Sequence, residues 1–177
     1  GYAYFEFADF NSDGHLDILT ANGDLGDYQC PPRKFHGVRI YLNDGRWNFQ
    51  EAFFYPLNGA YKSRAADFDG DGDLDIASIS FFPDYERSPE ESFVYLENQG
   101  GLKFTAHTFP DCYRGRWLTM DAGDLDGDGD MDVVLGGVYK TPFRAPEALL
   151  QRWQKDGPSL LILRNMFADR KTKATAR

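Results

Sequence analysis

The apolar and aromatic positions of this chain fall into short runs separated by glycine-rich and aspartate-rich turns. Three such runs end in asparagine, at 38–43 (VRIYLN), 93–98 (FVYLEN) and 160–165 (LLILRN). Short apolar segments bounded by turn residues are typical of β-strands, since amphipathic helices need longer stretches. The pattern therefore predicts an all-β structure. The segment 145–153 also allows a short surface helix that starts after Pro146.

A nine-residue aspartate-rich segment occurs three times and defines a repeat of about 57 residues. It reads DFNSDGHLD at 9–17, DFDGDGDLD at 67–75 and DLDGDGDMD at 124–132. In each repeat one strand leads into this segment, a second leaves it, and a third ends in asparagine. A fourth, aromatic strand follows a glycine turn in the first two repeats and is missing from the third. Four short strands per repeat predict a propeller blade, which has to stack on its neighbours.

The fold class predicted from the repeats is a partial β-propeller of three four-stranded antiparallel blades with a calcium loop in each. Blade 1 covers 1–57 and starts inside its first strand, blade 2 covers 58–114, and blade 3 covers 115–168 and is incomplete. The tail 169–177 is basic and polar, and we expect it to be disordered. Because the chain opens and stops inside a repeat, we expect it to be a piece of a larger propeller.

The aspartate-rich segments have the spacing of calcium loops. Their pattern D-x-[DN]-x-D-G-x-x-D puts oxygen-bearing side chains at positions 1, 3, 5 and 9, and Ca²⁺ takes six to eight oxygen ligands at roughly 2.3–2.6 Å. Glycine at position 6 permits a left-handed turn, and position 7 would supply its backbone carbonyl, with its side chain pointing outward. All-oxygen ligation disfavours zinc, and the strict six-ligand geometry of Mg²⁺ makes magnesium a poorer fit. The predicted ligands at three Ca²⁺ sites are Asp9, Asn11, Asp13, His15 and Asp17; Asp67, Asp69, Asp71, Asp73 and Asp75; and Asp124, Asp126, Asp128, Asp130 and Asp132, with His15, Asp73 and Asp130 acting through their carbonyls.

Other aspartate-rich turns fit the sequence less well. An EF-hand continues into a helix with Glu at position 12, whereas strand-like pairs such as Ile18-Leu19 follow position 9 here. Asp/Gly turns without a metal are the remaining alternative, and three copies in register disfavour it. The first loop has Asn11 where the others have Asp, so we expect it to release calcium first.

Together with the strands that follow them and the elements YLN at 41–43 and YLEN at 95–98, the loops resemble the FG-GAP and VCBS repeat family, which includes the integrin α-subunit propeller. The resemblance covers the chain up to about residue 168, and the family's Gly-Ala-Pro signature is kept only as NGAY at 58–61. It implies a ring of about seven blades and calcium bound mainly for structure by the aspartate loops. Cytosolic calcium is too low to fill such sites, so we expect an extracellular, cell-surface or periplasmic location.

The net charge of −9 belongs mostly to these loops, which hold thirteen of the 28 acidic side chains. An acidic chain argues against nucleic-acid binding, and the lack of an 18-residue apolar run argues against membrane insertion. Cys30 and Cys112 are far apart in sequence, and they could form one disulfide or stay as two inert thiols.

Three functions remain open. The favoured one is a calcium-stabilised binding or scaffold module for adhesion, carbohydrate or protein recognition, with the other blades of a parent propeller as further partners. Its ligand would sit on the rim formed by the inserts 23–37, 81–92 and 136–159, whose aromatic residues suit stacking but can equally pack between blades. The alternatives are part of a propeller-fold polysaccharide lyase or dehydratase, for which no catalytic motif appears, and a purely structural spacer. The insert aromatics are Tyr28, Phe35, Phe81, Phe82, Tyr85, Tyr139, Phe143 and Trp153.

The basic residues near the loops and inserts have less specific interpretations. Arg64 and Arg116 precede the second and third loops, and we interpret them as structural ion-pair partners rather than substrate clamps. His36 follows Arg33 and Lys34, and we interpret this cluster as solvated surface. The three histidines, His15, His36 and His107, occupy unrelated positions in the repeat, which disfavours a shared catalytic site.

Overall fold

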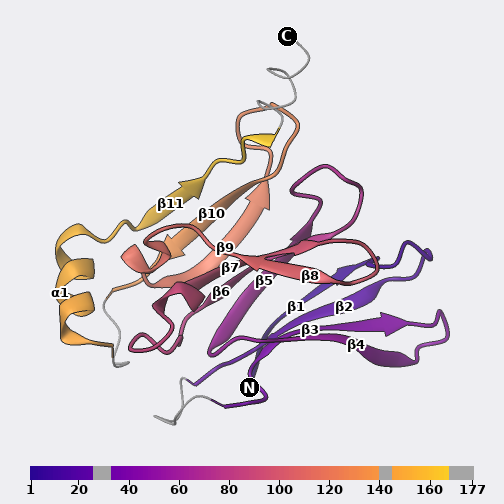
Figure 1. Cartoon of the computed structure of the whole chain (residues 1–177), viewed down its shortest axis with the longest axis horizontal. Helices are drawn as coiled ribbons and strands as arrows, with labels where there is room; N and C mark the ends of the chain where they lie inside the picture. Colours follow the sequence, from indigo (N-terminus) through magenta and orange to yellow (C-terminus); the bar gives the residue numbers. More distant parts are fainter. Residues whose placement is uncertain (26–32, 140–144, 168–177) are drawn as a thin grey trace.

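The computed structural model describes residues 1–25, 33–139 and 145–167, and these form three antiparallel sheets. Within each sheet the strands are paired in sequence order, and the second sheet lies between the other two (Figure 1). This arrangement is the predicted stack of repeats. The strands are β1 (Tyr2–Ala8), β2 (Asp17–Asn22), β3 (Gly37–Asn43) and β4 (Phe49–Pro56); β5 (Ala60–Ala66), β6 (Asp75–Ser80), β7 (Phe93–Asn98) and β8 (Phe104–His107); and β9 (Trp117–Gly123), β10 (Asp132–Gly137) and β11 (Leu160–Leu163).

The number of strands in each sheet follows the turn chemistry. A glycine turn connects β3 to β4 and β7 to β8, with Gly45 and Gly100 in the left-handed region at φ of +74° and +91°. No glycine follows β11 in the sequence, and the third sheet has three strands in the described chain. Two of the three sheets therefore have the predicted four strands, and the third has three among the described residues.

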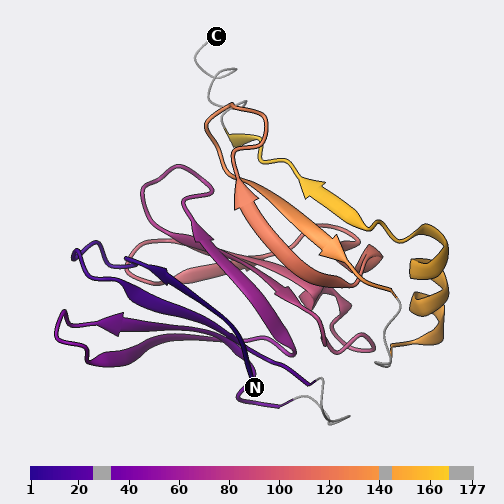
Figure 2. The ribbon, with the colours of Figure 1, turned by 180° about the vertical axis from the view of Figure 1, so that it is seen from behind.

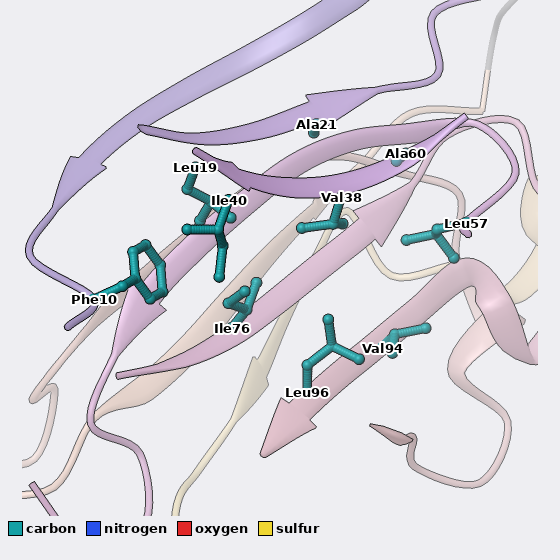
Figure 3. Close-up of a cluster of buried hydrophobic side chains, with 10 residues drawn as sticks. All are labelled: Phe10, Leu19, Ala21, Val38, Ile40, Leu57, Ala60, Ile76, Val94 and Leu96. Atoms are coloured by element: carbon teal, nitrogen blue, oxygen red, sulfur yellow. The ribbon is translucent and has the colours of Figure 1, made fainter. Parts of the chain in front are cut away.

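The sheets are held together by two apolar cores, one at each contact between neighbouring sheets. Figure 3 shows the first core, in which Leu19 and Ile40 of the first sheet face Ile76 of the second, and all three side chains are fully buried. Burying one such side chain contributes about 1.5–3 kcal/mol. Near the outer strands, the rings of Phe53 and Phe104 meet with 4.4 Å between their centroids.

The second core joins the second and third sheets in the same way. Ala77 and Ile79 of β6 pack with Trp117, Met120 and other side chains of the third sheet, and Trp117 is fully buried. The Trp117 indole N–H donates to the carbonyl oxygen of Cys112 at 2.7 Å, which satisfies its polar group. Cys112 itself is buried, while Cys30 lies outside the described residues.

The innermost strands of the three sheets, β1, β5 and β9, carry a row of charges that crosses both contacts. The Arg64 guanidinium lies 3.1 Å from a carboxylate oxygen of Glu6 and 3.0 Å from one of Asp121. The three residues occupy equivalent positions, since each pairs with the residue two places after the ninth aspartate of its loop. Arg64 is thus a structural ion-pair partner, as expected, but its acids lie outside the calcium-type loops.

The predicted helix after Pro146 is confirmed as α1 (Glu147–Asp156). It packs against the second sheet's connections through Trp153, whose indole N–H donates to the carbonyl oxygen of Tyr113 at 2.9 Å. Arg152 forms a two-pronged ion pair with Asp111. Two short 3₁₀ helices, Pro89–Ser92 and Cys112–Arg114, complete the described elements. Figure 2 shows α1 and the sheets from behind.

Candidate metal centres

The three aspartate loops occupy the same place in each sheet, between the innermost strand and the next one. They connect β1 to β2, β5 to β6 and β9 to β10. The glycine at position 6 has a positive φ in every loop, +86° at Gly14, +100° at Gly72 and +93° at Gly129, which confirms the predicted left-handed turn. Position 4 is left-handed too. It is glycine in the second and third loops but Ser12, with φ of +56°, in the first.

The second and third loops each bring three carboxylates together. Asp67, Asp69 and Asp71 offer oxygens that all lie within 4.8 Å of one another, and Asp124, Asp126 and Asp128 do the same. Two oxygens bound to one Ca²⁺ at roughly 2.3–2.6 Å can be no more than about 5 Å apart. The two clusters therefore fit a single calcium ion each.

Backbone N–H groups hold these carboxylates in place. In the second loop Gly72 N–H donates to Asp67 at 3.1 Å, and Asp71 N–H donates to Asp69 at 3.2 Å. Burial raises the pKa of Asp69, and the negative charge of Asp75 raises it further. Crowded carboxylates of this kind gain from a cation placed among them.

The first loop is different. Asn11 accepts a hydrogen bond from Asp13 N–H at 3.2 Å, and its amide nitrogen donates to the Asp13 carboxylate at 2.9 Å. The uncharged Asn11 amide thus donates a hydrogen bond to Asp13 at a position where the other loops have a further carboxylate. Within the described residues, only the second and third loops form clusters of three acidic groups.

The ninth aspartate of each loop is buried and ties the loop to the third strand of its sheet. Asp75 is fully buried and accepts hydrogen bonds from Phe68 N–H at 3.1 Å, Asn98 N–H at 2.8 Å and the Tyr95 hydroxyl at 2.8 Å. The lone pairs left on its oxygens still allow metal ligation, which stays a prediction. The two backbone contacts recur on Asp17, from Phe10 and Asn43, and on Asp132, from Leu125 and Asn165.

The asparagine at or just after the end of the third strand of each sheet is a structural residue that the loop motif alone does not reveal. The Asn43 amide donates to the carbonyl oxygen of Leu16 at 3.0 Å, and the Asn98 amide donates to that of Leu74 at 3.2 Å. Asn165 instead reaches Phe68 in the second loop, at 2.6 Å. Its recurrence in all three repeats is the sequence signal for this role.

A scan against protein-family models finds the FG-GAP-like repeat at residues 9–78 and 85–135, which is more than half of the chain. The chain belongs to the FG-GAP-like repeat family. FG-GAP repeats are β-propeller blades, so the three sheets form a partial propeller. FG-GAP repeats often bind calcium, and the family is typically extracellular. No curated protein matches the chain, and none of the described helices is long and apolar enough to cross a bilayer.

Position 7 of the FG-GAP loops does not behave uniformly. The His15 side chain is exposed and its ring lies against Gly45, in the turn between β3 and β4. Asp73 is half-buried, and Asp130 is only 6% exposed. The expectation of an outward side chain is therefore wrong for Asp130, which is buried beside Asp128 and donates its backbone N–H to the Asp128 carboxylate at 3.2 Å. Ligation by the three carbonyls remains a prediction.

The third FG-GAP loop has a cation of its own. The Arg164 guanidinium, just after β11, forms ion pairs with Asp126 and, at 3.3 Å, with Asp128. Arg164 comes directly before Asn165, the asparagine that recurs in each repeat. The residue at this position is Leu42 in blade 1 and Glu97 in blade 2. The third loop thus has as many carboxylates as the second, together with an arginine that competes with a bound cation.

One interpretation of a basic residue needs correction, and another stays a prediction. Arg116 is 1% exposed and its guanidinium lies 4.4 Å from the centre of the Phe81 ring, while its role as an ion-pair partner stays a prediction. His36 is 2% exposed, so it is not part of a solvated basic surface, and burial lowers its pKa. Only Arg33 and Lys34 of that cluster are exposed.

The insert aromatics mostly pack inside the molecule. Phe81 is 3% exposed and Trp153 is 1% exposed, whereas Phe35, at 55%, is the one large apolar side chain of the described insert residues that stands in solvent. Tyr28 and Phe143 lie outside the described residues. Sequence analysis left two roles open for these side chains, stacking on a ligand and packing between blades. Packing is the role that holds for Phe81 and Trp153.

A cavity of about 720 Å³ lies between the second and third blades, beside the outer edge of β11. Its walls include Tyr95 and His107 from blade 2 and Ile162 from blade 3. At the contact between the first two blades, the corresponding outer region is filled by Phe53 and Phe104. Among the described residues, the third sheet has no fourth strand to fill the corresponding space.

Proposed function

We propose that this chain is a calcium-stabilised propeller module that serves binding or scaffolding outside the cytosol. The observation that carries the proposal is the pair of three-carboxylate clusters, at equivalent positions in successive blades, whose oxygens are close enough to share one ion. Three Ca²⁺ sites are proposed, with the first weakened by Asn11. The FG-GAP family supports both the calcium and the extracellular location.

Calcium would act on the connection between the innermost strand and its neighbour. Each loop is already tied to the third strand of its sheet by the buried ninth aspartate, as Asp75 ties Phe68 to Asn98. An ion bound to positions 1, 3 and 5 would neutralise the carboxylates and fix the rest of the loop. At 1 mM free Ca²⁺ and a Kd of roughly 0.1 mM, one site contributes about 1.4 kcal/mol. Such sites fill at extracellular calcium concentrations and not at cytosolic ones.

The insert rim offers little aromatic surface for recognition among the described residues. With Phe81 and Trp153 buried, the described inserts offer one exposed aromatic side chain, Phe35. Sugar stacking on the rim therefore has little support.

Isothermal titration calorimetry of chelator-stripped protein tests the calcium proposal. We expect Ca²⁺ binding in the micromolar to millimolar range, with Asp71→Asn and Asp128→Asn each removing one site. Asp156→Asn is the matched control, because Asp156 is an exposed acid outside the loops. Loss of the same heat in all three variants, or no heat in the wild type, would refute the proposed sites.

A further inference from the structure

The segment that follows β11 reaches from the third blade onto the aspartate loop of the second blade. The Asn165 amide donates to the carbonyl oxygen of Phe68 at 2.6 Å. The Phe167 ring lies so close to Gly70 that a Cβ atom placed there would collide with it. Phe68 and Gly70 are the residues on either side of Asp69. The backbone that presents this candidate calcium ligand is therefore contacted from the neighbouring blade on both sides.

The Asn165 side chain also fixes the direction of this segment. Its amide oxygen accepts hydrogen bonds from the backbone N–H groups of Met166 at 2.8 Å and Phe167 at 3.2 Å. The backbone N–H of Asn165 donates to Asp132 at 2.8 Å, which anchors the segment on the third blade. Asn165 and Phe167 line the 720 Å³ cavity together with Asp69. The segment thus belongs to the third blade by its backbone and to the second loop by two side chains.

The second blade has no side chain that could make the same contact with the first loop. The Asn98 amide donates to Leu74 in its own loop at 3.2 Å, and the residue two places after Asn98 is Gly100. In the first blade the residue at this position is Gly45. The third blade has Phe167 where the other two have a turn glycine, and this exchange is the sequence signal for the contact.

The contacts act on the part of the second loop where a cation would bind. Asp67, Asp69 and Asp71 form the three-carboxylate cluster, and the Gly70 N–H donates to Asp67 at 2.7 Å. Carboxylates so close together repel one another, so contacts that hold their backbone keep them within reach of one ion. Partners that orient metal ligands in this way change metal affinity by about ten- to a hundredfold.

We propose that Asn165 and Phe167 are positioning residues for calcium in the second loop, and that this site couples ion binding to the docking of the third blade on the second. The inference rests on the proposed calcium sites and adds that the second ion acts between blades as well as within one. Binding and docking are linked reciprocally: the factor by which the docked third blade raises calcium affinity is the factor by which bound calcium strengthens docking.

Isothermal titration calorimetry measures the effect of the third blade on the ion. The titrations use the full chain with Asp128→Asn, which breaks the carboxylate cluster of the third loop and keeps that of the second. In this background Phe167→Ala should lower the calcium affinity of the second loop about tenfold. Phe167→Leu should recover part of it, because an apolar side chain again covers Gly70. Met166→Ala is the matched control, because the Met166 side chain is 39% exposed, and it should leave the affinity unchanged.

Amide hydrogen exchange, followed by NMR, measures the effect of the ion on the third blade. In the same Asp128→Asn background, Ca²⁺ should slow exchange of the Met166 and Phe167 amides about fivefold or more, although the third loop no longer has its own cluster. Adding Asp71→Asn, which breaks the second cluster, should abolish this protection. A role of Phe167 in packing alone predicts no dependence of these amides on calcium.

The outcomes separate the coupling from the calcium sites themselves. Calcium binding that is equally strong in Phe167→Ala and Met166→Ala would overturn the positioning role and leave the sites standing. Protection of the Met166 and Phe167 amides that persists with Asp71→Asn would overturn the coupling. A wild-type chain that gives no heat with Ca²⁺ would instead refute the proposed sites, and this inference with them.

Discussion

Replacing the ninth aspartate of the second loop should destabilise the protein even when no calcium is present. Asp75 is fully buried and accepts three hydrogen bonds, from Phe68, Tyr95 and Asn98. Asp75→Ala leaves three donors without an acceptor, each costing about 1–3 kcal/mol, and entry of water into the space lowers the total to about 4 kcal/mol. In a domain of this size 1 kcal/mol corresponds to about 2–4 °C, so the melting temperature should fall by about 8–16 °C.

Asp71→Ala, in the same loop, is the matched comparison. Asp71 is exposed and accepts a 2.9 Å hydrogen bond from Asp73 N–H, so its removal in chelator should cost about 1 kcal/mol or less. Thermal unfolding by circular dichroism in excess chelator measures both variants, with Asp75→Asn expected to be intermediate because it keeps one acceptor oxygen. Equal losses of melting temperature for Asp71→Ala and Asp75→Ala would refute the stabilising role of the Asp75 hydrogen bonds, because Asp75 would then act only through the metal.

Three further changes test other contacts. Arg164→Gln should tighten calcium binding at the third loop about two- to fivefold in calorimetry, because it removes ion pairs to two loop carboxylates worth roughly 0.2–1 kcal/mol; unchanged affinity would contradict this. The hydrogen bond from Arg152 lowers the pKa of Asp111, so the pair stabilises the fold above the ordinary carboxyl pKa and this gain is lost as the pH falls through the lowered value. Denaturant unfolding in chelator should thus give a higher free energy of unfolding for the wild type than for Asp111→Asn at pH 7, and this difference should shrink below about pH 4. A difference that does not change with pH would argue against the ion pair. Ser12→Gly should raise the melting temperature by about 1–3 °C, since Ser12 has φ of +56° where the second loop has Gly70, and a decrease would show that Ser12 is not strained.

The features that repeat in the sequence were the ones that could be predicted from it. Three copies of one nine-residue motif fixed the loop positions, and glycine at position 6 predicted the left-handed turn because few other residues adopt that conformation readily. The glycine turns after β3 and β7 predicted the hairpins that end the first two sheets. Local turn chemistry was sufficient in each case.

Contacts between distant residues could not be predicted in this way. The pairing of Asp75 with Asn98 depends on β6 lying beside β7, and the Glu6–Arg64–Asp121 row joins residues from three repeats. The burial of His36 reversed an interpretation based on its basic sequence neighbours. Sequence proximity describes the local charge, whereas burial is decided by the packing of elements that are far apart in the chain.

Calcium-dependent stability is the most direct test of the account. Chelator-stripped protein should be unfolded thermally while Ca²⁺ or, separately, Mg²⁺ is titrated. With three sites at about 1.4 kcal/mol each, 1 mM Ca²⁺ should raise the melting temperature by about 8–16 °C, Mg²⁺ should do far less, and Asp71→Ala combined with Asp128→Ala should remove most of the rise. No response to Ca²⁺, or an equal response to Mg²⁺, would mean that the aspartate loops are plain turns and would contradict the central claim.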